Sequence, residues 1–452
     1  MASWMRTLTA KVLGVGLLAL LMLIPLLQVH GLIAERQQLR ETTVAKIAQG
    51  WGGPQVLGGL MLAVPAQRLV GTTQDSIPKV ETSTEMVLAD SVTMDVVMAV
   101  HTRSYGIYSA PVYVSTVQMS GRFLPEDLAQ FRHMSSAEWQ NDKAELRLLL
   151  SDLRGLQEVT ELTINGRPGR FASSAEHSGG LSSVVVPVDL NALGHQPIQF
   201  VVKLKVAGTE SLQLLPLART TDVHIQAPWP DPSFVGALLP QQRSVDAQGF
   251  SARWHMLDLN RSYGQHWGGK SELDAGDLQS SAFGVQLYQP ADVYQRNERA
   301  SKYSLLFIAL TFVAFFLLEV LRRLRVHPLQ YLLVGAALTT FYVLLLALSE
   351  QIGFDWAYVV ASMAVVIMVS GYATAMLQAR RAGLLLGGVL ALIYAMLYGL
   401  IVAEQYALLM GAMVLLVTLA LMMYLTRRID WYAYAPATAS ASPVEAVTMG
   451  KS

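Results

Sequence analysis

The stretch FFLLEVLRRLRVHPLQYLLVG, residues 315–335, places one acid and three arginines between two long apolar runs. The chain is 52% hydrophobic and only 15% charged, whereas soluble domains have about 25% charged residues. Apolar runs occupy residues 12–33, 303–321, 329–348, 356–377, 383–403 and 406–425. Each has about 20 residues, enough to cross a hydrocarbon core of about 30 Å. The sequence therefore predicts six transmembrane helices, one N-terminal and five C-terminal.

Basic residues lie in every second connection between these spans. Arg6 and Lys11 precede the first span, whereas the loops SEQIGFDW (349–356) and AEQY (403–406) contain acids and no Lys or Arg. The positive-inside rule then predicts that both termini are cytoplasmic and that residues 34–302 lie on the other side of the membrane. The later topology anchors are Arg322, Arg323, Arg325, Arg380, Arg381, Arg427 and Arg428.

Glu319 is the acid of the opening stretch. It precedes Arg322 and Arg323 by three and four residues, so ion pairs along one helix face are expected. The second interpretation is an ionisable group that faces the bundle interior, where such groups often have a function. We regard Glu319, Glu350 and Glu404 as candidate polar groups at the membrane ends.

The exported segment has the alternation of β-strands. Apolar and polar residues alternate at 92–101 and 200–207, and Asn165-Gly166 is a hairpin signal because both residues accept positive φ. We expect about eight to twelve strands in an antiparallel β-sandwich-like fold, with helical pieces at 35–49 and 125–140. The fold class is thus an α+β membrane protein. The predicted domains are a cytoplasmic N-terminus with the first helix (1–33), a β-rich domain (34–302), a five-helix bundle (303–426) and a disordered cytoplasmic tail (427–452).

Motifs for enzymatic chemistry are weak in this chain. Zero net charge gives no reason to expect nucleic-acid binding, and the absence of cysteine excludes disulfides and thiolate sites. SIPK at 76–79 lacks the companion motifs of a serine acyl-enzyme, and His255 and His266 lack metal-ligand spacing. We therefore predict no enzyme activity, catalytic residue, cofactor or metal site. A nucleophile paired with a base through the tertiary fold would contradict this prediction, and sequence spacing cannot reveal such a pair.

Two further segments are candidates for packing or contact. Gly383 and Gly387 form a G-x-x-x-G pattern, which we expect to be a helix-packing seam within one chain. APWPDPSF at 227–234 is the candidate interaction surface, because its prolines and aromatics are unusual in a solvated loop. The other interpretation is a loop buried on the sandwich. The residues of this candidate surface are Trp229, Pro230, Pro232 and Phe234.

The chain resembles the CreD family of bacterial inner-membrane proteins from about residue 20 to 432. The resemblance is carried by WGGPQVLGG (51–59), SYGIYSAPVY (104–113), WPDPSFVGALLP (229–240), RASKYSLLFIALTFVAFFLLEVL (299–321), HPLQYLLVG (327–335), LLLALSEQIGF (344–354) and YLTRRIDWY (424–432). The sequence departs from the family pattern at Asp231, Gln351 and Gln405. Because the family pattern has other residues at these three positions and the chain tolerates the change, we interpret the positions as structural.

The resemblance implies a multi-pass protein of the bacterial inner membrane with a periplasmic domain. It further implies a regulon controlled by the CreBC two-component system, a link to envelope stress and the β-lactam response, and no established enzymatic activity. We expect a non-enzymatic protein of envelope integrity that contacts the lipid bilayer and a periplasmic protein or cell-wall component. A passive transporter or channel gated by the periplasmic domain is the alternative. Oligomeric state cannot be predicted.

Overall fold

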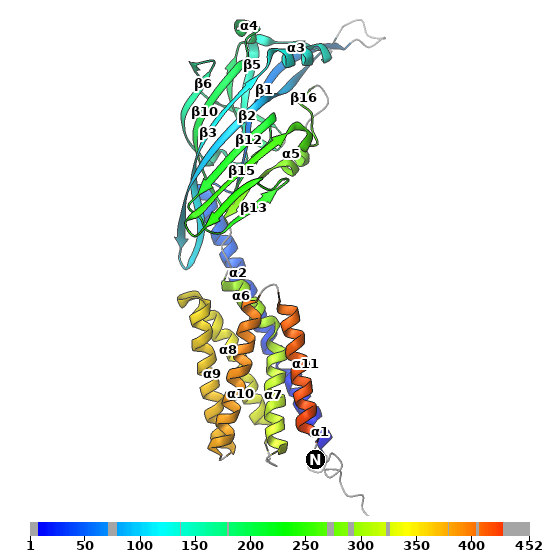
Figure 1. The fold of residues 1–452 in the computed structure, drawn as a ribbon, viewed down its shortest axis with the longest axis vertical. Coiled ribbons are helices and arrows are strands. Elements are labelled where there is room, and N and C mark those ends of the chain that lie inside the picture. Colours follow the sequence, from blue (N-terminus) through cyan, green and yellow to red (C-terminus); the bar gives the residue numbers. More distant parts are fainter. Residues whose placement is uncertain are drawn as a thin grey trace, which may run out of the picture. The chain divides into compact units, whose positions relative to one another are not determined.

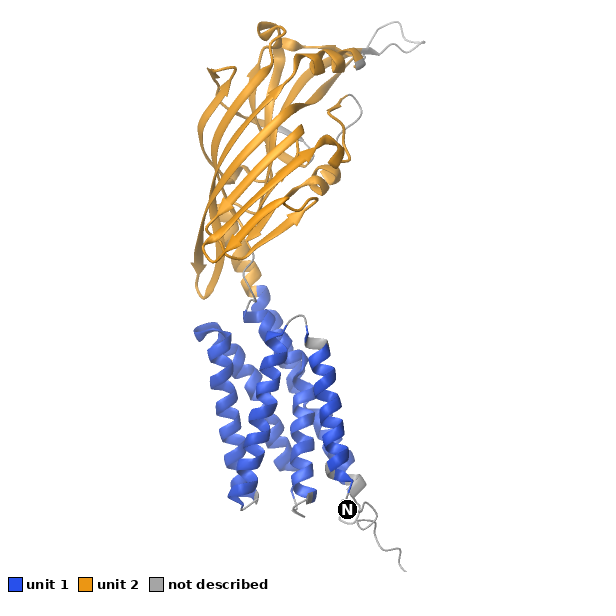
Figure 2. Cartoon of the chain, viewed as in Figure 1, with its two compact units in different colours: residues 1–38, 291–452 blue, residues 39–290 orange. Residues whose placement is uncertain are grey.

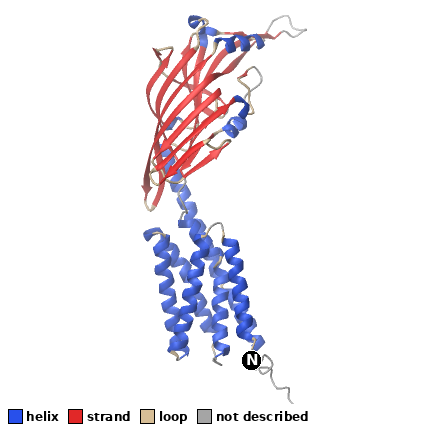
Figure 3. Cartoon of the chain, in the orientation of Figure 1, coloured by secondary structure: helices blue, strands red, loops and turns tan. Residues whose placement is uncertain are grey.

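The protein divides into two compact units, residues 1–38 with 291–452 and residues 39–290 (Figure 2). The computed structural model describes residues 8–70, 79–135, 137–178, 180–268, 275–287, 293–321, 326–377, 379–403 and 406–427. Long helices form the first unit and strands dominate the second (Figures 1 and 3). We call them the helical unit and the β unit.

The helical unit contains α1 (Leu8–Leu21), the first part of α2 (Leu23–Trp51), α6 (Val293–Lys302), α7 (Ser304–Leu321), α8 (Pro328–Ile352), α9 (Phe354–Leu377), α10 (Arg380–Val402) and α11 (Ala407–Thr426). Pro25 has no N–H to donate to the carbonyl of Leu21, which accounts for the break between α1 and α2. The ring of His327 caps α8 by accepting from the N–H of Leu329 at 3.2 Å. Gly353, with φ of 80°, ends this helix.

Four helical stretches are long and apolar enough to cross a membrane: Lys11–Trp51, Pro328–Ile352, Phe354–Met376 and Arg380–Val402. The pair α6 and α7, bent by 46°, makes a fifth if it is one broken span. Helix α11 has 20 residues, none of them charged. Multiple membrane-spanning helices are thus confirmed, whereas the number six stays a prediction.

Seventeen strands make up the sheets of the described part of the β unit. They are β1 (Gln55–Val70), β2 (Lys79–Tyr105), β3 (Tyr108–Phe123), β4 (Glu138–Trp139), β5 (Ala144–Leu150), β6 (Leu156–Ile164), β7 (Arg167–Pro168), β8 (Ala172–Ser178), β9 (Leu181–Val188), β10 (Ile198–Thr209), β11 (Ser211–Leu215), β12 (Ala218–Ala227), β13 (Pro232–Gly236), β14 (Gln242–Asp246), β15 (Gly249–Leu257), β16 (His266–Trp267) and β17 (Phe283–Leu287). The short helices are α3 (Pro125–Met134), α4 (Leu190–Leu193) and α5 (Ala275–Ser281).

Two sheets share strand β2. The β1 sheet has the order β13-β17-β11-β1-β5-β9-β8, and residues 79–88 of β2 also pair with β1. The β3 sheet has the order β14-β15-β12-β2-β3-β10-β6-β7 and uses residues 89–105 of β2. A strand of 27 residues is long enough to take part in both sheets.

The strand arrangement corrects two expectations. The pairs β1–β11 and β2–β12 are parallel, so the fold is mixed rather than wholly antiparallel. The strand count exceeds the expected range partly because β4, β7 and β16 have two residues each, too short for any alternation to show in sequence. The hairpin at Asn165-Gly166 is confirmed, with φ of 49° and 77°. The helical piece at 35–49 is confirmed as part of α2, whereas the piece expected at 125–140 is helical only over α3, and Glu138–Trp139 form β4 instead.

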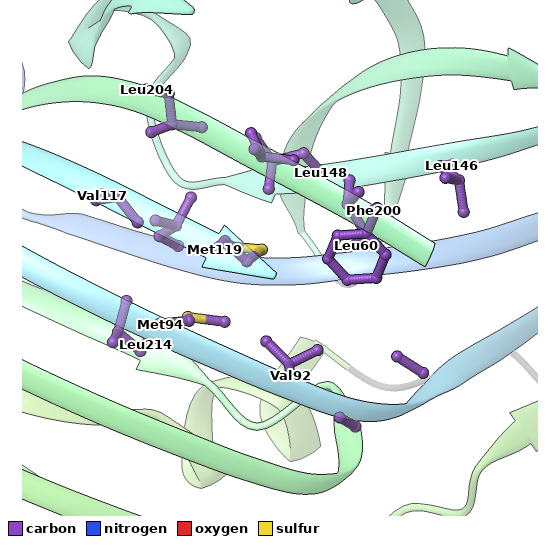
Figure 4. Close-up of a cluster of buried hydrophobic side chains, with 14 of the residues drawn as sticks. Leu60, Val92, Met94, Val117, Met119, Leu146, Leu148, Phe200, Leu204 and Leu214 are labelled. Atoms are coloured by element: carbon purple, nitrogen blue, oxygen red, sulfur yellow. The ribbon is translucent and has the colours of Figure 1, made fainter. Parts of the chain in front are cut away.

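The core of the β unit lies where side chains of the two sheets meet (Figure 4). Leu60 and Leu148 come from the β1 sheet, and Met94, Met119 and Phe200 come from the β3 sheet; each is at most 1% exposed. In β2, β3 and β10 alternate residues face outward, which explains the period-two pattern in the sequence. Strands β1 and β5 are buried on both faces and show no such alternation.

Candidate functional site

Glu319 is a buried acid of the helical unit, with its side chain 4% exposed. One carboxylate oxygen accepts from Lys11 Nζ at 2.6 Å and from the N–H of Val326 at 3.2 Å. The other accepts from the hydroxyl of Tyr331 at 2.9 Å. Helices α1, α7 and α8 therefore meet at this group, which we call the Glu319 cluster.

This geometry bears on the two interpretations of Glu319. Arg322, Arg323 and Arg325 lie outside the described residues, so the expected pairs with the following arginines are not part of the described structure. What the structure does show is an acid inside the bundle, bonded to a lysine 308 positions earlier in the chain. The sequence predicts only a topology role for Lys11, because spacing along a chain carries no signal for such a contact.

The surroundings of Glu319 explain how a carboxylate can be buried there. A buried charge is costly unless it is paired and hydrogen-bonded. Here one ammonium, one hydroxyl and one backbone N–H surround it. The rings of Phe312 and Phe315 meet the ring of Tyr331 edge-on, with centroids 5.7 and 5.5 Å away, and hold its hydroxyl in place.

A second polar cluster surrounds α6, the helix that follows the β unit in the chain. The hydroxyl of Tyr294 donates to Glu350 at 2.9 Å, and Asn297 Nδ2 donates to Ser349 Oγ at 2.9 Å. Arg296 pairs with Asp355 at 3.1 Å. These bonds, which we call the α6 cluster, attach α6 to α8 and to the start of α9.

The α6 cluster also includes α2 and α10. Ser301 Oγ lies 3.0 Å from Nδ1 of His30 on α2, and the hydroxyl of Tyr398 on α10 donates to Asp355 at 2.9 Å. The two segments that lead into and out of the β unit are therefore bonded to each other within the helical unit. Glu350 thus has a defined structural partner, whereas Glu404 lies outside the described residues.

Aromatic packing fills part of the bundle interior. The ring of Phe341 lies 4.6 Å from that of Tyr394 and 5.4 Å from that of Tyr358, and the Tyr358 hydroxyl donates to the carbonyl of Tyr394. A small cavity of about 10 Å³ lies nearby, room for about one water molecule. Its lining residues are Phe307, Ile308, Thr311, Leu338, Tyr342, Ile393 and Tyr394.

The predicted glycine seam is confirmed as packing within one chain. A Cβ on Gly383 would collide with Thr374 Oγ1, and one on Gly387 would collide with Ser370 Oγ. Both contacts belong to α9, so the two glycines let α9 and α10 approach closely. Gly388 points elsewhere, with nothing within 4 Å of its built Cβ.

The topology anchors that the structure describes are exposed. Arg380 and Arg381 begin α10, and Arg427 follows α11 with its guanidinium 4.1 Å from the ring centroid of Tyr424. Arg428 lies outside the described residues.

The candidate interaction surface is only partly accessible. Trp229 and Phe234 pack against the core of the β unit, and the Phe234 ring meets Phe250 edge-on at 5.8 Å. Pro232 is half-buried and Pro230 is exposed. The structure thus gives the aromatics a packing role, and contact with a partner stays a prediction for the exposed part of this segment.

The histidines His255 and His266 of the β unit contact different acids. His255 Nδ1 lies 2.6 Å from Asp222, and His266 Nε2 lies 2.7 Å from the buried Glu85. Within the described ranges, no three His, Cys, Asp or Glu side chains gather as a metal site would require. Ser76 of the SIPK motif lies outside those ranges.

Two segments that carry the family resemblance meet at the end of α2. Trp51 Nε1 donates to the carbonyl of Tyr113 at 3.2 Å, and the guanidinium of Arg103 lies 4.1 Å from the centroid of the Trp51 ring. Asp152 accepts from the N–H of Gly53 at 3.4 Å. The Arg154 guanidinium, bonded to the same carboxylate at 2.8 Å, lowers the pKa of Asp152.

Comparison with known proteins gives a consistent result over nearly the whole chain. The family model described as "Inner membrane protein CreD" matches residues 7–432. Inner membrane protein CreD of Escherichia coli (strain K12) is 34% identical over 418 residues, which cover 92% of this chain and 92% of that protein.

Two solved structures match the chain at low sequence identity. Native yeast LTA4 hydrolase is 12% identical, with 50% of this chain and 34% of that chain covered and a TM-score of 0.20. The complex of yeast LTA4 hydrolase with bestatin is 10% identical, with 80% and 69% covered and a TM-score of 0.21. Because both TM-scores lie below 0.5, these two structures carry no argument here.

Proposed function

Since this chain belongs to the CreD family of inner membrane proteins, we propose that it helps maintain the bacterial cell envelope as a multi-pass protein. In this proposal the β unit lies in the periplasm and contacts a wall component or partner protein. The helical unit anchors it in the lipid bilayer. We also propose the domain division expected from the sequence, in which the β-rich domain covers residues 34–302.

The α6 cluster is the observation that carries the proposal. The chain enters the β unit through α2 and leaves it through α6, and His30 of α2 lies 3.0 Å from Ser301 of α6. Bonds to Glu350 and Ser349 then attach α6 to α8. An anchor that is to hold a domain against load needs its connecting segments fixed to the membrane part, and this arrangement supports that role.

The distribution of charge within the helical unit supports the proposed orientation. Lys11 lies beside Glu319 near the carboxyl end of α7, and the start of α10 lies at the same end of the unit (Figure 1). Arg380 and Arg381 occupy that start, whereas Glu350 and Asp355 lie at the other end, around the turn from α8 to α9. A cytoplasmic basic end fits the positive-inside rule. A reporter enzyme fused near position 200 should be active only in the periplasm, and cytosolic activity would overturn the orientation.

In-cell photocrosslinking of the full chain tests the partner contact. We would place the photoreactive residue at Pro230 or at Leu239, which is 64% exposed, and as a control at Glu161 on the opposite edge of the β3 sheet. The expected result is that Pro230 and Leu239 capture the same protein or wall fragment and Glu161 does not. Equal capture from all three positions, or none from any, contradicts this contact surface.

The buried Glu319 favours a second candidate, a passive transporter or channel, because ionisable groups inside membrane bundles often line a pathway. Proteoliposomes that contain the full chain separate the two candidates. Substrate or ion flux that Glu319→Gln abolishes supports transport. A tight bilayer, together with specific crosslinks from the β unit, supports the anchoring role.

A further inference from the structure

The outer face of the β3 sheet brings together an acid, a histidine and a serine from three strands. His224 on β12 lies opposite Asp95 of β2 in the parallel pair, and its Nδ1 is 3.5 Å from Asp95 Oδ1. Its other ring nitrogen, Nε2, is 2.9 Å from Ser251 Oγ on β15. Residues more than 150 positions apart in sequence thus use both nitrogens of one imidazole.

This connectivity is that of a nucleophile, a base and an orienting carboxylate. In the tautomer that carries its proton on Nδ1, the nitrogen on the side of Asp95, the lone pair of Nε2 faces the Ser251 hydroxyl and can take its proton. The same roles recur on unrelated folds, where geometry rather than sequence order identifies them. Strand pairing brings the three side chains together here, which is why no motif predicts them.

A groove of about 390 Å³ opens beside Ser251, within the size range of small-molecule sites. Gln226, the cross-strand partner of Ser251, lines it and offers a side-chain amide donor for the oxygen of a bound carbonyl. Val97 and Pro228 give the groove an apolar part. Asp246, also in the lining, disfavours an anionic substrate.

We propose that Ser251, His224 and Asp95 form a hydrolytic site for small uncharged carboxylic esters. This activity goes beyond the envelope role and departs from the non-enzymatic character predicted from sequence. Ser251 and His224 are the catalytic residues, and Asp95 is a positioning residue that acts through the imidazole.

The reaction proceeds by acyl transfer to the serine. Ser251 Oγ forms a bond to the ester carbonyl carbon while its proton moves to His224 Nε2, and the carbonyl π electrons move to the oxygen. Collapse of this tetrahedral species breaks the bond to the alkoxy oxygen, which takes the proton from Nε2 and leaves as the alcohol. Water then attacks the acyl group, its proton passing through Nε2 to Ser251 Oγ, and the carboxylic acid is released.

Exposure sets the expected strength of each contribution. The side chain of Asp95 is 60% exposed and that of His224 is 26% exposed. Water therefore screens the charge of Asp95, and its removal should matter less than removal of the base. We expect about a 100-fold loss of serine reactivity without His224, at the low end for a general base, and less than about a 10-fold loss without the Asp95 charge.

The same sheet face offers matched controls. His255 pairs with Asp222 at 2.6 Å and so repeats the histidine–acid pair of His224 and Asp95. Among the described contacts, the His255 ring bonds to this acid and to no serine. Ser120 is an exposed serine of β3. Neither residue lines the groove. His255→Asn and Ser120→Ala should leave reactivity unchanged.

The test uses the full-length protein in detergent micelles and a fluorophosphonate probe, which bonds covalently to activated serines. We expect mass spectrometry to find the label on Ser251, Ser251→Ala to lose it, and labelling to slow by the stated factors in His224→Asn and Asp95→Asn. Hydrolysis of p-nitrophenyl acetate should follow the same order.

Absence of label from Ser251 in the unaltered, folded chain overturns the proposal, and so does labelling of His224→Asn at the unaltered rate. The position of the label in the unaltered chain decides the question even where a variant folds poorly. An unreactive Ser251 leaves the envelope role untouched, because crosslinking and topology test that role separately.

Discussion

The contact between Lys11 and Glu319 predicts a measurable coupling between the first helix and the C-terminal bundle. The perturbations are Lys11→Met, Glu319→Gln and the double variant. Lys11→Met leaves a carboxylate that is 4% exposed with only the Tyr331 hydroxyl and one N–H as its described donors. The uncompensated buried charge should destabilise the helical unit.

The structure sets the size of this effect. Removing one partner of a fully buried ion pair costs about 3–5 kcal/mol. The Lys11 side chain is 36% exposed, so water screens part of the attraction, and we expect about 2 kcal/mol for Lys11→Met. Residues in direct contact couple by about 0.5–3 kcal/mol, and we expect about 1 kcal/mol for this pair.

The assay is reversible unfolding of the full chain in mixed micelles. The free energy of unfolding is measured for the unaltered chain, the two single variants and the double variant, which together form a double-mutant cycle. Lys302→Met is the matched control, because its ion pair with Glu298 is mostly exposed, and it should change that free energy by less than about 0.5 kcal/mol. Strict additivity of the two single substitutions, within about 0.3 kcal/mol, would refute the reasoning.

Three further measurements test other features. Gly383→Ala should destabilise the helical unit by about 1–3 kcal/mol, because the added Cβ would push into α9. Gly388→Ala has open space around it and should stabilise the unit by up to about 1 kcal/mol. Equal changes in the free energy of unfolding for the two variants would contradict the glycine seam. Asn297→Leu should cost about 1–2 kcal/mol in the same unfolding measurement, since it removes the buried bond from α6 to α8, and a neutral result argues against the α6 cluster. Asp152, whose pKa is lowered chiefly by Arg154, contributes stability above its unfolded pKa of about 4 that is lost as pH falls through the lower folded value. Asp152→Asn should therefore flatten the acid limb of the melting temperature against pH, and an unchanged limb contradicts this.

Local sequence signals predicted the elements of the fold better than their pairing. Apolar runs of span length and the positive φ of Asn165-Gly166 depend only on neighbouring residues, and both features appear in the structure. The parallel pairing of β1 with β11 depends on segments about 150 residues apart and leaves no periodic trace.

In the candidate sites, too, contacts that depend on local patterns were predictable from the sequence and contacts between distant segments were not. The contact of Gly383 with α9 was foreseeable because a small-residue pattern is local. Lys11 and Glu319 are 308 positions apart, and Asp95, His224 and Ser251 meet only because strand registers align them. Trp229 and Phe234 looked like a contact surface because sequence does not reveal which aromatics a sandwich will bury.

The parallel register of β1 with β11 has a consequence for biogenesis. β2 and β5 pair with most of β1, but Gln55–Gly58 pair on one side with Leu212–Leu215 of β11, so that edge lacks its neighbour until roughly 155 further residues have been synthesised. Pairing that waits for distant segments is slow and leaves unpaired edges prone to aggregation. We therefore expect this edge of β1 to be the part of the nascent β unit most exposed to wrong pairing until β11 has been synthesised.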